Sequence, residues 1–186
     1  MKTWMIATSI LTVALLAPSV APADDRPAAQ TKLDKETVEA IELFKKADPE
    51  MARLFKEAAG YAVFPGVSKG AAGIGAAHGQ GQVYTEGRLI GTATLTQVTI
   101  GLQLGGQEFA EVIFFETKET LDAFAAGKFA MSAQVTAIAA VDGASSTANY
   151  QHGVQVYTVA KGGLMFEASV GGQKFRFTPL RKVPLY

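Results

Sequence analysis

The spacing of apolar residues changes once along this chain, and that change limits which folds the sequence can adopt. Before residue 60, apolar side chains recur every three or four positions, as on one face of an α-helix. From Tyr61 onward the dominant period is two, because successive side chains of a strand point to opposite faces of a sheet. Helices followed by a run of strands predict an α+β fold rather than alternating β-α-β units.

The helical part is predicted to contain two helices. In the first, Val38, Ile41 and Phe44 recur at helical spacing and form an apolar face. Asp48-Pro49-Glu50 then indicates a second start, since aspartate caps a helix, proline is tolerated at its first position and an acid suits the first turn. The second apolar stripe consists of Met51, Leu54, Phe55 and Ala58, and Gly60 is predicted to end this helix.

Three segments of the strand part have distinct patterns. Val98, Ile100, Leu102 and Leu104 alternate with Thr99, Gly101 and Gln103, which predicts a half-buried strand. Alternation also predicts strands at residues 164–170 and 174–178, with Phe175 and Phe177 opposite Lys174 and Arg176. Residues 112–115 have no polar alternation and predict a strand covered on both faces. A helix at 118–126, capped by Thr117 and ended by Gly127, is predicted to interrupt the sheet.

Glycines punctuate the strand part. Pairs at Gly79/Gly81, Gly105/Gly106 and Gly171/Gly172 each precede a Gln-x-aromatic sequence and are predicted to form hairpin turns, with Glu86-Gly87 as a fourth turn. The expected fold is therefore α+β, with N-terminal helices packed on a twisted, largely antiparallel β-sheet. The pattern leaves open whether that sheet curls into a barrel.

The first residues resemble an export signal. Lys2 precedes an apolar stretch at 5–17 that is too short to cross a bilayer, and Ala21-Pro22-Ala23 matches an A-x-A cleavage site. An uncleaved anchor is the alternative. The expected organisation is a signal peptide at 1–23, a flexible leader at 24–30 and a single domain at 31–186, in a periplasmic or secreted protein. Because the chain has no cysteine, the core must hold this fold without disulfides.

Composition and motifs argue against several function classes. Seventeen basic and seventeen acidic residues cancel, so no net positive field favours nucleic acid. His78 and His152 are the only histidines, and no short-range metal-ligand spacing occurs. The glycine-rich stretch at 69–81 has Lys69 at its start rather than at its end, unlike a P-loop. We therefore predict no catalytic residues, no metal, no cofactor and no enzyme activity.

Two groups of basic residues are candidates for membrane contact. Lys45, Lys46, Arg53 and Lys56 accompany the two predicted helices, and amphipathic helices with basic residues can lie in a lipid interface. In that arrangement the cations face outward while Ile41, Leu54 and Phe55 pack inward. The alternative is that the apolar stripe packs on the sheet and the cations are merely solvated. The second group comprises Lys174, Arg176, Arg181 and Lys182.

The segment from 60 to 180 resembles the bacterial SYLF family. The similar blocks are residues 60–70 (beginning Gly60-Tyr61-Ala62-Val63-Phe64), 95–97, 101–107, 113–115, 160–169 and 171–175, in the family's order. The resemblance implies lipid binding, with phosphoinositide or actin as partners of eukaryotic members. An exported bacterial member would meet neither, so the resemblance implies anionic phospholipid at the cell envelope. Lys45, Lys46, Arg53 and Lys56 are the expected lipid contacts, and a structural or protein-interaction module with an envelope partner is the alternative.

Overall fold

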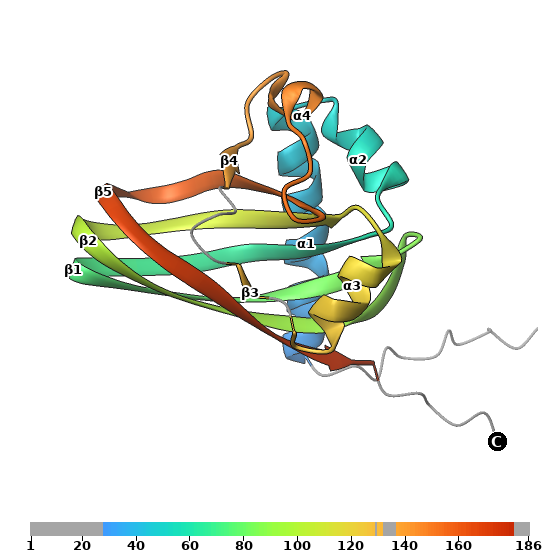
Figure 1. Ribbon diagram of the computed structural model, residues 1–186, viewed down its shortest axis with the longest axis horizontal. Helices are drawn as coiled ribbons and strands as arrows, with labels where there is room; N and C mark the ends of the chain where they lie inside the picture. The colour runs from blue at the N-terminus through green and yellow to red at the C-terminus, as the bar shows by residue number, and fades with distance from the viewer. Residues whose placement is uncertain (1–27, 129, 132–136, 181–186) are drawn as a thin grey trace, which may run out of the picture.

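The computed structural model describes residues 28–128, 130–131 and 137–180, without the side chains at 130–131 and 164–170. The expected signal peptide, residues 24–27 of the leader, and Arg181 and Lys182 lie outside the described residues. The predicted α+β fold is confirmed (Figure 1). The elements are α1 (Ala28–Ala47), α2 (Met51–Glu57), β1 (Gly60–Thr85), β2 (Arg88–Phe115), α3 (Lys118–Ala125), β3 (Ala130–Met131), β4 (Ile138–Ala139), α4 (Ala144–Thr147) and β5 (Val154–Pro179).

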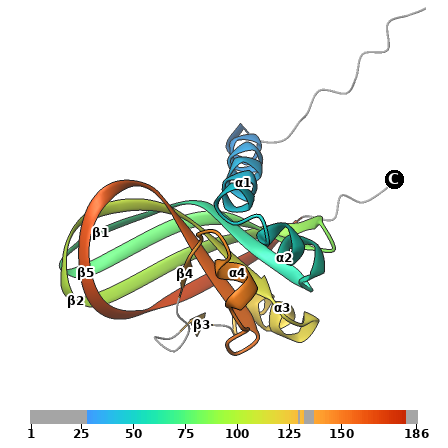
Figure 2. The same cartoon turned by 90° about the horizontal axis from the view of Figure 1, so that it is seen from above.

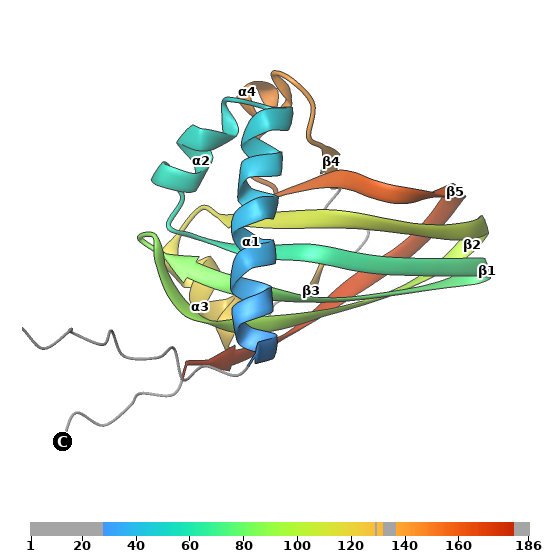
Figure 3. The ribbon, with the colours of Figure 1, turned by 180° about the vertical axis from the view of Figure 1, so that it is seen from behind.

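Three long strands build most of the sheet, and each contributes to two layers. β1, β2 and β5 contain 26, 28 and 26 residues and pair antiparallel in the order β1-β2-β5, while β3 and β4 add to β5. All three turn back at the end farthest from α2 and α3, so the two halves of each strand lie in different layers (Figures 1 and 2). The sheet does not close into a barrel. Within the described chain β1 pairs only with β2, and α1 crosses the β1 side of both layers (Figure 3).

Two apolar clusters hold these layers together. The first lies between the layers and includes Phe64, Ile113, Phe115, Phe124 and Phe175. We call the layer with residues 60–72 of β1 and 104–115 of β2 the first layer, and the layer with residues 74–85 and 88–100 the second layer. The second cluster packs α1 and α2 on the outer face of the first layer and includes Phe44, Met51, Leu54, Val63, Val112, Phe114 and Tyr157. Residues 112–115 of β2 alternate between the two clusters and are all fully buried, which confirms the strand predicted to be covered on both faces.

The glycine pairs do not form hairpin turns, so that prediction is wrong for three of its four sites. Only Glu86-Gly87 joins two strands: both residues have positive φ, 49° and 72°, and Thr85 pairs with Arg88 as in a two-residue hairpin. The other pairs lie inside β1, β2 and β5. At Gly81 the reason is close packing, because a Cβ there would overlap the Val63 carbonyl oxygen and the Phe64 ring.

The three predicted helices are present, but some of their ends and buried residues differ from the prediction. α1 begins at Ala28, so residues 28–30 of the expected leader are helical. Its buried row is Leu33, Thr37, Ala40 and Phe44, whereas Val38, expected in the apolar face, is exposed. α2 ends at Glu57, and Gly60 begins β1 instead of ending the helix. For α3 the predicted cap is confirmed, since Thr117 Oγ1 accepts a hydrogen bond from the Thr120 amide at 3.3 Å.

The alternating segment of β2 has the predicted period but the opposite burial from an ordinary half-buried strand. Thr99 and Gln103 are 3% and 4% exposed, whereas Ile100 and Leu102 are 64% and 74% exposed. Near Pro179, by contrast, Phe175 packs into the core while Lys174 and Arg176 are exposed, as predicted. The alternation predicted at 164–170 lies outside the described side chains.

Candidate functional site

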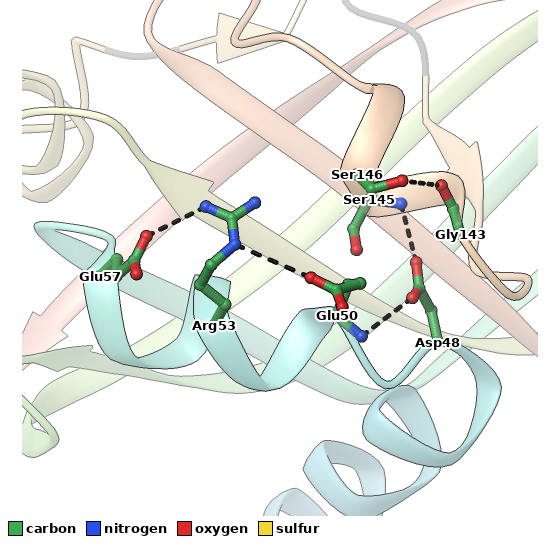
Figure 4. Close-up of polar contacts among 7 residues, drawn as sticks. All are labelled: Asp48, Glu50, Arg53, Glu57, Gly143, Ser145 and Ser146. Atoms are coloured by element: carbon green, nitrogen blue, oxygen red, sulfur yellow. Dashed lines mark hydrogen bonds and ion pairs between the residues drawn. The ribbon is translucent and has the colours of Figure 1, made fainter.

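The turn between α1 and α2 is anchored by a buried carboxylate. Asp48 accepts hydrogen bonds from the amide of Glu50 at 3.1 Å and from the amide of Ser145 at 2.7 Å (Figure 4). Burial by itself would raise the pKa of Asp48, but these amide hydrogen bonds outweigh it and hold the pKa below its usual value. The prediction that Asp48 caps the second helix is wrong, since α2 begins at Met51 with Glu50 as its N-cap. Asp48 instead fastens the α1–α2 turn to α4.

The four predicted contact cations lie on this helix pair with the expected orientation. Lys46, Arg53 and Lys56 are exposed, and Lys45 is half-buried with its Nζ 5.9 Å from the centre of the Phe55 ring. On the other side, Leu54 is buried and both Ile41 and Phe55 are half-buried against the second cluster. We call the part of α1 and α2 that carries these four cations the helix-pair surface.

Acidic neighbours compensate half of these cations. Lys45 Nζ lies 2.9 Å from Glu42, and Arg53 lies 3.0 Å from Glu57 and 4.0 Å from Glu50 (Figure 4 shows the Arg53 pairs). Lys46 and Lys56 form no ion pair with any described residue. Exposed pairs of this kind are weak. Even so, the charge most available to an external anion belongs to Lys46 and Lys56.

A polar cavity between the layers was not predicted from the sequence. It has a volume of about 320 Å³ and is lined in part by Lys69, Gln97, Gln107, Glu111 and Gln173. Gln173 Nε2 donates a hydrogen bond to Glu111 Oε2 at 2.9 Å. Burial raises the pKa of Glu111 to about 7, although the Gln173 hydrogen bond acts in the opposite direction. A neutral Glu111 carboxyl is therefore populated near pH 7.

Other candidate chemistry is limited in the described part of the chain. No cluster of three or more His, Asp or Glu side chains there could hold a metal ion. None of its helices has the length and apolar character that crossing a bilayer requires. In the second basic group, Lys174 and Arg176 are exposed on β5.

Comparison with known proteins agrees with the resemblance seen in the sequence. Residues 96–178, from the middle of β2 to near the end of β5, match the Ysc84 family, described as "Las17-binding protein actin regulator". The SYLF (Ysc84) family is therefore the family that this segment resembles. The chain is also 29% identical over 143 residues to "Beta cell expansion factor A" of Aeromonas veronii, a match that covers 73% of the chain and 51% of that protein. It thus spans about half the length of this relative.

The segment matched to the SYLF family excludes the helix-pair surface. Lys45 to Lys56 precede residue 96, whereas Glu111 and Gln173 of the polar cavity lie inside the matched segment. The inward position of Glu111 could have been found from the sequence. It lies two residues from each of the core residues Phe109 and Ile113, and alternate residues of a strand point to the same face.

Proposed function

We propose that this protein is an exported, non-enzymatic protein that binds anionic phospholipid at the cell envelope. The match of residues 96–178 to a family of binding modules supports the general class. The observation that carries the anionic preference is the helix-pair surface, where Lys46 and Lys56 are exposed and unpaired within the described chain. Each basic residue near an anionic membrane contributes about 1 kcal/mol to binding.

Replacing Lys46 and Lys56 with glutamine is expected to weaken binding to anionic vesicles by about 2 kcal/mol, roughly 30-fold. Flotation with vesicles of phosphatidylcholine, with and without phosphatidylglycerol, measures this effect. Binding to the neutral vesicles should change little, and added salt should weaken wild-type binding to the anionic ones because it screens the attraction.

The matched control replaces Lys45 and Arg53 with glutamine. Both cations already pair with glutamates, so this variant should lose less affinity than the Lys46 and Lys56 variant. Both double variants should keep the wild-type melting temperature, since exposed side chains contribute little to stability. Unchanged anionic binding after replacement of all four cations would show that lipid contact is made elsewhere.

Export is the second part of the proposal, with a periplasmic or secreted location. Cleavage after Ala23 should yield a mature chain that begins at Asp24. Intact mass spectrometry of protein from the periplasmic or secreted fraction checks this. A membrane-bound chain that retains residues 1–23 would instead indicate an uncleaved anchor.

A structural or protein-interaction module of the envelope is the alternative function. The family description names a protein, Las17, as a binding partner of family members, which favours this class over catalysis. Absence of binding to both neutral and anionic vesicles would favour this alternative over lipid binding.

A further inference from the structure

The end of the sheet where the strands turn back presents apolar side chains to solvent. We call the region formed by residues 70–76 of β1 and 98–106 of β2 the distal end (Figures 1 and 3 show it opposite α2 and α3). Its large exposed apolar residues are Ile74, Val98, Ile100, Leu102 and Leu104, with exposed fractions from 55% to 74%. They lie on adjacent strands, since Ile74 pairs with Ile100 and Leu104 pairs with Ala72. The exposed residues therefore form one patch rather than scattered positions.

Polar groups of the distal end point inward and bond to one another. Thr99 Oγ1 donates to Gln103 Oε1 at 2.8 Å, and Gln103 Nε2 donates to the carbonyl oxygens of Gly73 and Thr99, each at 3.0 Å. The backbone of β2 pairs with β5 throughout this region, and with β1 at residues 98–100 and 104–106 but not at 101–103. Most backbone groups of the patch are thus paired within the sheet, which favours contact with hydrocarbon.

The charge pattern around the distal end matches a lipid interface. No Asp, Glu, Lys or Arg occurs at residues 70–85 of β1 or 89–107 of β2, whereas β5 carries Glu167 opposite the inward-facing Gln103. Behind Val98 on the same outer face, Lys174 pairs with Thr96 and Arg176 pairs with Thr94, and both cations are exposed. Four and six residues of strand place them about 13 and 20 Å behind Ile100. Apolar faces of interfacial proteins enter the headgroup boundary by about 5–10 Å, so both cations lie on the headgroup side of the inserted tip.

We propose that the distal end inserts into a phospholipid bilayer, with Ile74, Ile100, Leu102 and Leu104 in its apolar region and Lys174 and Arg176 at the headgroups. This rests on the proposed lipid-binding function and assigns the apolar contact to the end opposite α2. The distal end and the helix-pair surface are therefore competing sites of membrane contact: if the distal end inserts, replacing Lys46 and Lys56 changes binding less than about 30-fold. A bilayer is the favoured occupant because the patch is a projecting end of the sheet, which a fluid medium can surround. On β1 and β2 an apolar tip without charged residues is followed, along the layer that contains Val98, by the cations Lys174 and Arg176 of β5. A bilayer has the same order, with hydrocarbon inside and anionic headgroups outside.

Site-specific fluorescence tests this assignment directly. The chain contains no cysteine, so Leu102→Cys, Val38→Cys and Ala52→Cys each provide one site for a nitrobenzoxadiazole probe in the full chain. With vesicles of phosphatidylcholine and phosphatidylglycerol, emission at residue 102 should shift to shorter wavelength and be quenched by brominated acyl chains. The probe at residue 38 should report no change, although Val38 is itself an exposed apolar residue outside the distal end. The probe at residue 52 reports on α2.

A pair of polar variants tests the contribution to affinity. Leu102→Gln with Leu104→Gln should weaken vesicle binding at least about tenfold, because burial of either leucine would contribute more than a tenfold factor. Val38→Gln with Val141→Gln is the matched control, since both valines are exposed and lie outside the distal end. Equal melting temperatures of the two variants would show that folding is retained.

The outcomes separate this inference from the proposed function. A wild-type chain that binds neither neutral nor anionic vesicles overturns the proposed function, and the inference with it. Wild-type binding with a shift at residue 52 but none at 102 overturns the inference alone and places the contact on α2. If the leucine variant binds vesicles normally but loses self-association in light scattering, a second copy of the chain covers the distal end, and the inference is again wrong.

Discussion

Alanine at Gly81 is expected to lower the free energy of unfolding by about 3 kcal/mol, the upper range for overpacking a core. Gly81 lies in the half of β1 that forms the second layer, directly against the first. A Cβ there would overlap the Val63 carbonyl oxygen and come within 2.6 Å of the Phe64 ring. Both Val63 and Phe64 are fully buried, so neither can move without disturbing its neighbours. Urea unfolding of the two proteins measures the difference.

Gly70 on the same strand provides the matched control. Nothing lies within 4 Å of a Cβ at that position, and its φ is not positive. Gly70→Ala should therefore be neutral or raise the unfolding free energy by up to about 1 kcal/mol, through the reduced freedom of the unfolded chain. Similar urea midpoints for the two variants would mean that the layers are not in contact at Gly81.

Glu111→Gln is expected to raise the free energy of unfolding by about 3 kcal/mol at pH 8. The pKa of Glu111 is raised from its usual 4.5 to about 7 by burial, so the folded protein binds this proton more tightly than the unfolded chain does. The stability that this proton provides is full below about pH 4.5 and is lost as pH rises to about 7. An amide keeps a neutral group beside Gln173 at every pH, and so removes the loss.

Unfolding in urea at a series of pH values between 4 and 9 measures this effect. The wild-type free energy should fall between pH 4.5 and 7 relative to that of the variant, and the two curves should run parallel above pH 8. Glu108→Gln is the control, because Glu108 lies on the exposed face of the same strand. Its replacement controls for the loss of one negative charge from this strand. If Glu111→Gln is no more stable than wild type at pH 8, the carboxyl is not buried as described.

The period of the apolar residues was enough to predict the α+β class and the doubly covered part of β2. The cap at Thr117 likewise located α3, since its signal is local. The glycine pairs misled the prediction because two different causes select the same residue. A turn needs glycine for positive φ, whereas Gly81 is required by the approach of a neighbouring layer. Only knowledge of which strands are stacked can separate these causes.

The inverted burial of the distal end shows what alternation leaves undetermined. A period of two says that the faces of a strand differ, but not which face is inward. The inward face can be found by counting, because residues an even number of positions apart on a strand point to the same face. Gln103 therefore shares its face with the buried Phe109 and Ile113, six and ten residues farther along β2. Counting back from that doubly buried segment would have placed Leu102 and Leu104 outside.

The sequence analysis predicted which side chains of the helix pair face outward, but not which of its cations are paired with acidic residues. Burial of Leu54 and exposure of the cations follow from the helical stripe. The compensation of Arg53 by Glu50 and Glu57 follows from spacings of three and four residues, which were present in the sequence. The hydrogen bond from the Ser145 amide to Asp48 joins residues 97 positions apart, so no local sequence pattern could have predicted it.

The sharing of each long strand between two layers determines how this protein can be divided. The segment matched to the family begins at residue 96, within β2, and contains no part of β1. A fragment of residues 96–178 would expose the edge of β2 that β1 now pairs with, and would lose Phe64 and Val63 from the two clusters. The smallest unit able to fold alone is therefore larger than the matched segment. Shuffling in evolution, or dissection in the laboratory, should preserve β1 together with β2 and β5.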